Sequence, residues 1–197
     1  VNNIMIALYA FVIISFFITI VDIIIRFPLQ SEMIDYNDIQ AIVINVLALL
    51  IQIVFFAYGF VNAIRGMLSP KRMGAVITAF FAATCITGTG NMVIYSNVQI
   101  VLWWIVLIIP NIVGAVATFA YFVLGKKSKI YSIIIYLVAI WGMFRIIYSN
   151  YNLIVHANQY LSMNSTVRLV LGIAIHCLVI YQTYVLWIKR QNAIDIS

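Results

Sequence analysis

Hydrophobic residues run along this chain in six long blocks, which short polar or charged segments separate. Each block is about 20 residues or longer, the length that a helix needs to cross the hydrocarbon core of a bilayer. None of the blocks alternates apolar and polar residues, as the strands of a membrane barrel do. The pattern therefore predicts six transmembrane helices, at Ile4–Arg26, Ala41–Arg65, Met73–Tyr95, Val98–Gly125, Ile130–Ser149 and Val167–Lys189.

The composition indicates that lipid surrounds these helices. Of the 197 residues, 65% are hydrophobic and 8% are charged, whereas soluble domains have roughly 45–50% apolar and 25% charged residues. A soluble fold of this length could not bury so much apolar surface. We therefore expect an all-α, multi-pass membrane protein with one domain over residues 1–197, in the cell membrane and specifically a bacterial plasma membrane. The first block lacks the basic start and the cleavage pattern of a signal peptide, so we expect a retained helix.

The basic residues predict how the helices are oriented. Eight of the eleven Lys and Arg residues fall on one side of the membrane if the N-terminus is also on that side, and these are Arg65, Lys71, Arg72, Lys126, Lys127, Lys129, Lys189 and Arg190. Basic loops remain in the cytoplasm, so the rule predicts that both termini are cytoplasmic. The requirement for basic cytoplasmic loops also accounts for the net charge of +6. We therefore expect no nucleic-acid partner.

Polar residues recur at helical spacing inside the second, third and fourth blocks. Asn45, Gln52 and Gly59 are seven residues apart, and the third block carries Thr87 and Asn91 in a row of small residues. Such residues either bond neighbouring helices together or line a polar cavity. The glycines and threonines of segment 84–91 either break the third helix or bond back to their own backbone.

Pro110 and Asn111 lie near the middle of the fourth block. Proline removes a backbone donor and kinks a helix. Asn111 is expected either to bond a backbone group that the proline leaves free or to point into the bundle as a ligand contact.

Three ionisable residues lie within the apolar blocks, where charge is costly and often functional. Arg145 and Asp22 are both near the outer ends of their helices, which motivates an Asp22–Arg145 ion pair; the alternatives are that each reaches water, or that Asp22 pairs with Arg26. His176 falls close to the predicted bilayer centre, where it either carries protons or is a neutral, hydrogen-bonded residue of the bundle.

Signatures of catalysis and of bound cofactors are absent from the sequence. There is no HExxH helix, no GxSxG elbow and no phosphate-binding loop. Cys85 and Cys177 show no CxxC spacing, so neither zinc nor a dithiol pair is expected. We therefore expect neither an enzyme nor a metal or cofactor site.

Two main functions remain open, besides an intramembrane enzyme, which would need Asp22, His176 or Cys177 to cluster in one cavity. The first is a small-solute transporter, or a membrane-embedded substrate-binding subunit, with a site in the outer half of the bundle for a small anionic solute; its walls would be Asn45, Gln52, Thr87, Asn91, Asn111, Arg145 and His176. The second is a non-transporting accessory, immunity or stress-related protein with a membrane-protein partner, in which these polar residues hold helices together.

The chain's length and its predicted topology are similar to those of the small substrate-binding subunits of multi-component vitamin importers. The similarity concerns architecture alone. The first helix lacks the stripe of small residues with which such subunits dock a partner.

Overall fold

The structure, a computed structural model, describes residues 2–29, 36–95, 104–156 and 163–194. All regular structure in these ranges is helical. The long helices are α1 (Asn2–Leu29), α2 (Tyr36–Ile64), α3 (Pro70–Tyr95), α6 (Lys129–His156) and α7 (Met163–Ile194). The fourth spanning segment is a composite of the π-helix η2 (Trp104–Ile108), α5 (Ile109–Thr118) and the π-helix η3 (Phe119–Val123).

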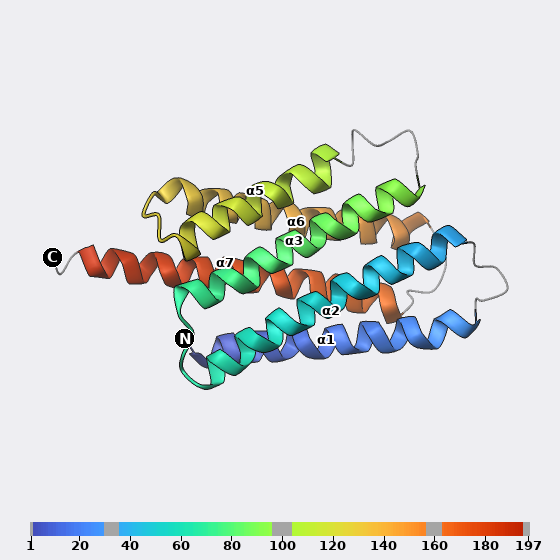
Figure 1. Cartoon of the computed structure of the whole chain (residues 1–197), viewed down its shortest axis with the longest axis horizontal. Coiled ribbons are helices and arrows are strands. Elements are labelled where there is room, and N and C mark those ends of the chain that lie inside the picture. The colour runs from blue at the N-terminus through green and yellow to red at the C-terminus, as the bar shows by residue number, and fades with distance from the viewer. Residues whose placement is uncertain (1, 30–35, 96–103, 157–162, 195–197) are drawn as a thin grey trace.

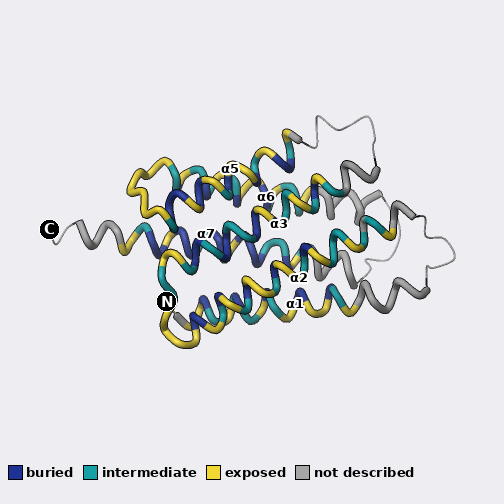
Figure 2. The backbone as a smooth tube through the Cα atoms, in the orientation of Figure 1, coloured by how far each residue is buried: buried dark blue, intermediate teal, exposed yellow. Residues whose placement is uncertain are grey.

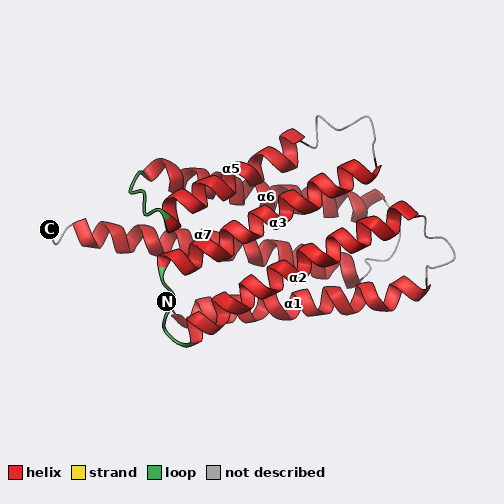
Figure 3. Ribbon diagram, viewed as in Figure 1, coloured by secondary structure: helices red, strands yellow, loops and turns green. Residues whose placement is uncertain are grey.

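Six helical segments are long and apolar enough to cross a membrane, which makes the chain a multi-pass membrane protein. They lie side by side as one bundle (Figure 1). In sequence order each contacts the next, and α1 also contacts α7, so the six form a closed ring. A further contact between α3 and α7 crosses that ring. Figure 3 shows that the described loops lie together at one end of the bundle.

The two turns at this end, residues 65–69 and 125–128, are built alike. Together with the first residues of the helices that follow them, they carry six of the eleven basic residues, namely Arg65, Lys71, Arg72, Lys126, Lys127 and Lys129. We call this end of the bundle the basic end. Gly66 (φ 67°) follows the end of α2, and Gly125 (φ 68°) follows the end of η3. Both residues adopt the left-handed conformation, which glycine adopts without steric cost. After Gly66, Met67 donates its N–H to the Asn62 carbonyl at 2.9 Å, which is the bond that closes a helix C-terminus. The side chain of Ser69 then accepts the Arg72 N–H at 3.3 Å and caps the start of α3.

Helix ends differ from the boundaries that hydropathy predicts. The helix predicted at 130–149 continues to His156, and that predicted at 167–189 begins at Met163. The predicted loop at 150–166 was therefore too long. Hydropathy measures how much of a helix is apolar, whereas the helix itself continues into polar sequence until a residue that disfavours helix or a tertiary contact ends it. The fourth segment, predicted as one kinked α-helix, instead carries π-helices on both sides of α5.

Buried side chains concentrate inside the ring and toward the basic end (Figure 2). The bulkiest fully buried residues there include Tyr9, Phe56, Tyr121 and Phe122. Large apolar side chains such as Ile14, Val54 and Leu137 are more than half exposed on the outside of the bundle. An apolar exterior around a packed interior is the arrangement expected of helices that lie in lipid.

Candidate functional site: a polar cavity inside the ring

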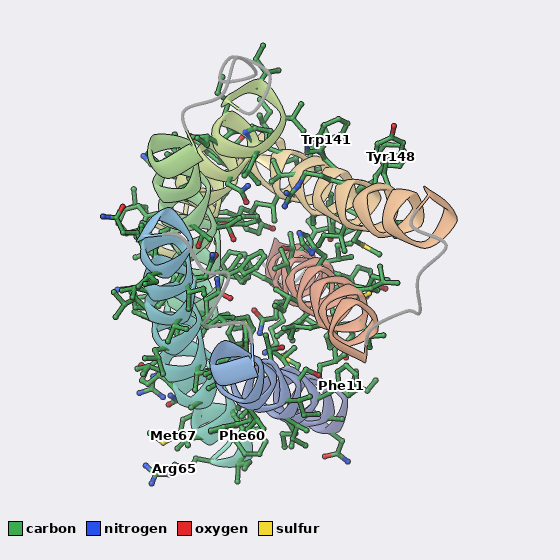
Figure 4. All side chains as sticks on the ribbon, turned by 90° about the vertical axis from the view of Figure 1, so that its right-hand side faces the viewer. Phe11, Phe60, Arg65, Met67, Trp141 and Tyr148 are labelled. Carbon is green, nitrogen blue, oxygen red and sulfur yellow. The ribbon has the colours of Figure 1, made fainter. Side chains whose placement is uncertain are left out.

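A cavity of about 540 Å³ lies inside the ring, and all six spanning segments contribute to its wall. Its lining residues come from the C-terminal halves of the spanning parts of α1, α3 and α6 and from the N-terminal halves of the other three. Because consecutive helices run in opposite directions, both sets lie in the same half of the bundle, away from the basic end. We call this half the cavity half. Figure 4 looks at the bundle from this end.

The structure brings together six of the seven residues that the sequence indicates as a site. Asn45, Gln52, Thr87, Asn111, Arg145 and His176 all line the cavity. The seventh, Asn91, belongs to α3, but its side chain lies outside the described residues. The same holds for the side chain of Asp22 in α1, so the predicted Asp22–Arg145 ion pair falls outside the described part of the chain.

Arg145 provides the only charge among the described residues that line the cavity. Its guanidinium has no ion-pair or hydrogen-bond partner among the residues that the structure describes. Trp141, one turn earlier on α6, also lines the cavity, whereas Tyr148 is 59% exposed and points away from the ring (Figure 4). A cation that borders a half-apolar cavity without a partner attracts an anion strongly, because little water competes there.

His176 lies deeper in the cavity and is held in one orientation. Its Nδ1 is 2.6 Å from the carbonyl oxygen of Gly172 one turn earlier. A carbonyl only accepts, so Nδ1 donates, and in the neutral ring Nε2 keeps its lone pair. The ring packs edge-on against Phe80, with centroids 5.4 Å apart. It also fills the space over Gly142, where any Cβ would collide with Nε2.

Pro110 shapes the wall that η2 and α5 form. Because proline has no N–H, the carbonyl of Val106, four residues earlier, loses its normal helical donor. That carbonyl accepts the Trp141 indole N–H from α6 at 2.9 Å. The neighbouring Leu107 carbonyl accepts Asn111 Nδ2 at 2.6 Å. Asn111 thus bonds the carbonyl next to the one that the proline leaves free, and not that carbonyl itself. It also lines the cavity, where its side chain is available for a ligand contact.

The threonines of α3 line the cavity without interrupting their helix. Thr84 and Thr87 donate their hydroxyls to the carbonyls of Phe80 and Ala83, at 2.9 and 2.8 Å. Helix α3 is α-helical from Pro70 to Tyr95. The expectation that these threonines bond to their own backbone is therefore correct, and the alternative of a broken third helix is wrong. Each hydroxyl oxygen keeps a free lone pair for a ligand.

Sequence reasoning missed several residues of the wall. Thr19 and Phe16 from α1 line the cavity, as does Gly142. The isolated glycine in the otherwise bulky helix α6 was the available signal, since an unexplained helical glycine often marks a close approach. Among the described residues, no group of three His, Cys, Asp or Glu side chains is arranged to hold a metal ion.

Comparison with models of known protein families, with curated proteins and with solved structures finds no significant match. The function must therefore be inferred from the site itself.

Proposed function

We propose that the protein takes up a small organic anion into the cavity, as a small-solute transporter or as the substrate-binding subunit of one. One observation carries the proposal: polar side chains from separate helices converge on one cavity that has a single described charge, Arg145. Its volume of about 540 Å³ falls within the range of roughly 300–1,000 Å³ for ligand sites.

The hydrogen bonds favour this function over that of a non-transporting protein held together by polar contacts. Thr19, Thr84, Thr87 and His176 each bond a backbone carbonyl of their own helix. Bonds of this kind do not join helices. These four side chains therefore face the cavity without holding the bundle together, whereas the Trp141 indole does join α6 to η2.

We further propose that the cavity half faces outward, with the basic end and both termini in the cytoplasm of a cell whose plasma membrane holds the protein. The basic turns support this orientation through the positive-inside rule. The exposed Ser128 provides a test in a Cys85→Ala/Cys177→Ala background. A membrane-impermeant maleimide should label Ser128→Cys only after cells are permeabilised, and labelling of intact cells would reverse the orientation.

The binding of an anion is tested by thermal unfolding of the purified protein with benzoate as the probe. Benzoate should raise the unfolding midpoint of the wild type. Arg145→Gln should weaken binding by roughly 10- to 150-fold, because a hydrogen bond to a charged group contributes about 1.5–3 kcal/mol. Lys129→Gln removes the same charge from an exposed position at the basic end and should leave binding unchanged. Equal binding by Arg145→Gln and the wild type would contradict the proposal.

Transport itself requires a second measurement. Proteoliposomes that contain the wild type should accumulate labelled benzoate faster than those with Arg145→Gln. If benzoate binds but does not cross, the protein acts as the binding subunit and needs a partner for translocation.

A further inference from the structure

The cavity has a floor and a wall of different chemistry. Helices α1, α3 and α6 run away from the basic end, whereas α2, α5 and α7 run toward it. The deepest lining residue of each helix follows from these directions. Together they form what we call the cavity floor, which consists of Phe16, Gln52, Phe80, Asn111, Val138 and His176.

Arg145 stands well above this floor. It follows Val138 by seven residues on α6, which corresponds to about 10 Å along the helix axis at 1.5 Å per residue. Since the side chains reach into the cavity from both levels, a ligand that touches both is a small molecule with two distinct ends. One end meets a cation and the other meets the floor.

The polar part of the floor is neutral. Gln52 is 8% exposed, lines the cavity and has no hydrogen-bond partner among the described residues. Asn111 uses its amide nitrogen on the Leu107 carbonyl, so its Oδ1 remains as an acceptor. His176 uses Nδ1 on the Gly172 carbonyl, which leaves Nε2 of the neutral ring. The floor thus offers acceptors from three helices, together with the free amide donors of Gln52.

The Gln52 residue is more than nine-tenths buried, and its amide borders the cavity without a hydrogen-bond partner among the described residues. The hydrogen bonds of this amide are therefore left to whatever occupies the cavity, which makes Gln52 the second, independent sign of a ligand. Phe16, Phe80 and Val138 surround the polar groups with apolar surface. A second negative charge placed here would have only Arg145 as a described cation within electrostatic reach, and that cation already pairs with the charge at the other end of the ligand. Burial of a charge that lacks a cation of its own is strongly unfavourable.

We infer that the ligand is an organic monoanion whose carboxylate pairs with Arg145 and whose opposite end is a neutral, N–H-bearing group of amide type bound by Gln52, Asn111 and His176. This inference rests on the proposed function and specifies its substrate class. A flat apolar body between the two ends fits the aromatic and aliphatic surface of the floor.

Four para-substituted benzenes of nearly equal size test the inference: 4-carbamoylbenzoate, 4-methylbenzoate, terephthalate and terephthalamide. Affinity is measured by the shift of the unfolding midpoint and by calorimetric titration. 4-Carbamoylbenzoate should bind most tightly, about 3- to 10-fold better than 4-methylbenzoate. The reason is that its amide exchanges hydrogen bonds to water for hydrogen bonds to the polar groups of the cavity floor. Terephthalate, with two charges, and terephthalamide, with none, should each be weaker by roughly tenfold or more.

Two variants of α2 identify the floor as the source of this preference. Gln52→Met removes the unpartnered amide and should abolish the preference for 4-carbamoylbenzoate while 4-methylbenzoate binds as before. Asn62→Leu is the matched control, because Asn62 is also 8% exposed on α2 but bonds the Tyr58 carbonyl toward the basic end. It should retain the preference.

The outcomes separate this inference from the function on which it rests. If 4-methylbenzoate and 4-carbamoylbenzoate bind equally through Arg145, or if terephthalate binds best, the anion site stands and the inferred ligand class is wrong. A preference that persists in Gln52→Met also overturns it. If none of the carboxylates binds, the proposed function falls, and the ligand class falls with it.

Discussion

The two halves of the bundle contain similar residue types but use them differently. Toward the basic end, Tyr9, Phe56, Tyr121 and Phe122 are at most 1% exposed and fill the ring. In the cavity half, the same six segments surround about 540 Å³ of space. Polar residues are buried in both halves, so their number alone does not distinguish a packed core from a site.

Two glutamines show what does distinguish the halves. Gln182 on α7 is fully buried near the basic end, and its Nε2 donates to the Tyr9 hydroxyl on α1. It therefore joins two helices, which is the structural use of an intramembrane amide. Gln52 lines the cavity and has no such partner among the described residues. A polar side chain thus indicates a site when it borders a cavity and has no bond to a neighbouring helix.

The largest expected effect contrasts a packed with a cavity-lining environment and comes from two adjacent phenylalanines of α3. Phe81 is fully buried, whereas Phe80 is 7% exposed and borders the cavity. Phe81→Ala should lower the free energy of unfolding by about 3–5 kcal/mol, the usual result of such truncations. Phe80→Ala should cost at least about 1 kcal/mol less, because part of its surface already lacks packing partners.

Reversible unfolding in mixed detergent micelles, followed by circular dichroism, measures both values. Phe80 also contacts His176 and Phe81, so the two variants are compared in the absence of ligand. Equal losses would mean that the face of α3 that borders the cavity is as tightly packed as the face that is turned away from it.

Two glycines give the next largest effect and should separate stability from binding. A Cβ on Gly74 of α3 would collide with Cβ of Phe122, close to the backbone of η3, which cannot move aside easily. Gly74→Ala should therefore destabilise the protein by about 1–3 kcal/mol. A Cβ on Gly142 would instead collide with the His176 ring, which would have to turn away from Gly142 and give up its hydrogen bond to the Gly172 carbonyl.

Gly142→Ala should consequently reduce the affinity for 4-carbamoylbenzoate by roughly tenfold, while stability falls by about 1 kcal/mol, the net contribution of the one hydrogen bond that is lost. Thermal unfolding with and without the ligand measures both quantities in one experiment. A loss of stability in Gly142→Ala equal to that in Gly74→Ala would show that His176 is packed as firmly as the core at the basic end.

Sequence patterns predicted the helices and six polar or charged residues of the cavity wall because both depend on periodicity along one helix. The spacing of Asn45 and Gln52 places them on one face of α2, and both line the cavity. The orientation of that face toward α6 and α7 depends on tertiary packing, which periodicity does not contain. Hence the sequence did not indicate the role of Gly142, although it did indicate His176, whose ring occupies the space over Gly142.

The fourth segment shows a second limit of the sequence. Pro110 predicted a local kink, yet the structure has a π-helix on each side of α5, at Trp104–Ile108 and Phe119–Val123. A proline specifies which N–H is missing, but the response depends on the donors that neighbouring helices bring. Here Trp141 of α6 and Asn111 of the same segment bond the carbonyls of Val106 and Leu107.

The smallest predicted effect concerns this bond between α6 and η2, which joins two helices within the cavity half. Trp141→Phe removes the indole donor to the Val106 carbonyl but retains an aromatic ring to stack on Phe144, whose centroid lies 6.1 Å away. Hydrogen bonds within membranes contribute about 0.6 kcal/mol on average and up to about 1.7 kcal/mol. We expect a loss near the upper value, because Pro110 leaves that carbonyl no donor at position 110.

A double-mutant cycle with Pro110→Ala tests this reasoning. The alanine restores an N–H four residues after Val106, so the carbonyl regains a helical donor and no longer needs the indole. Trp141→Phe should then cost little in the Pro110→Ala background, and the two substitutions should be non-additive in the free energy of unfolding. Additive losses would mean that Trp141 stabilises the cavity half through ring packing alone, so that packing rather than hydrogen bonding keeps α6 against η2 beside the cavity.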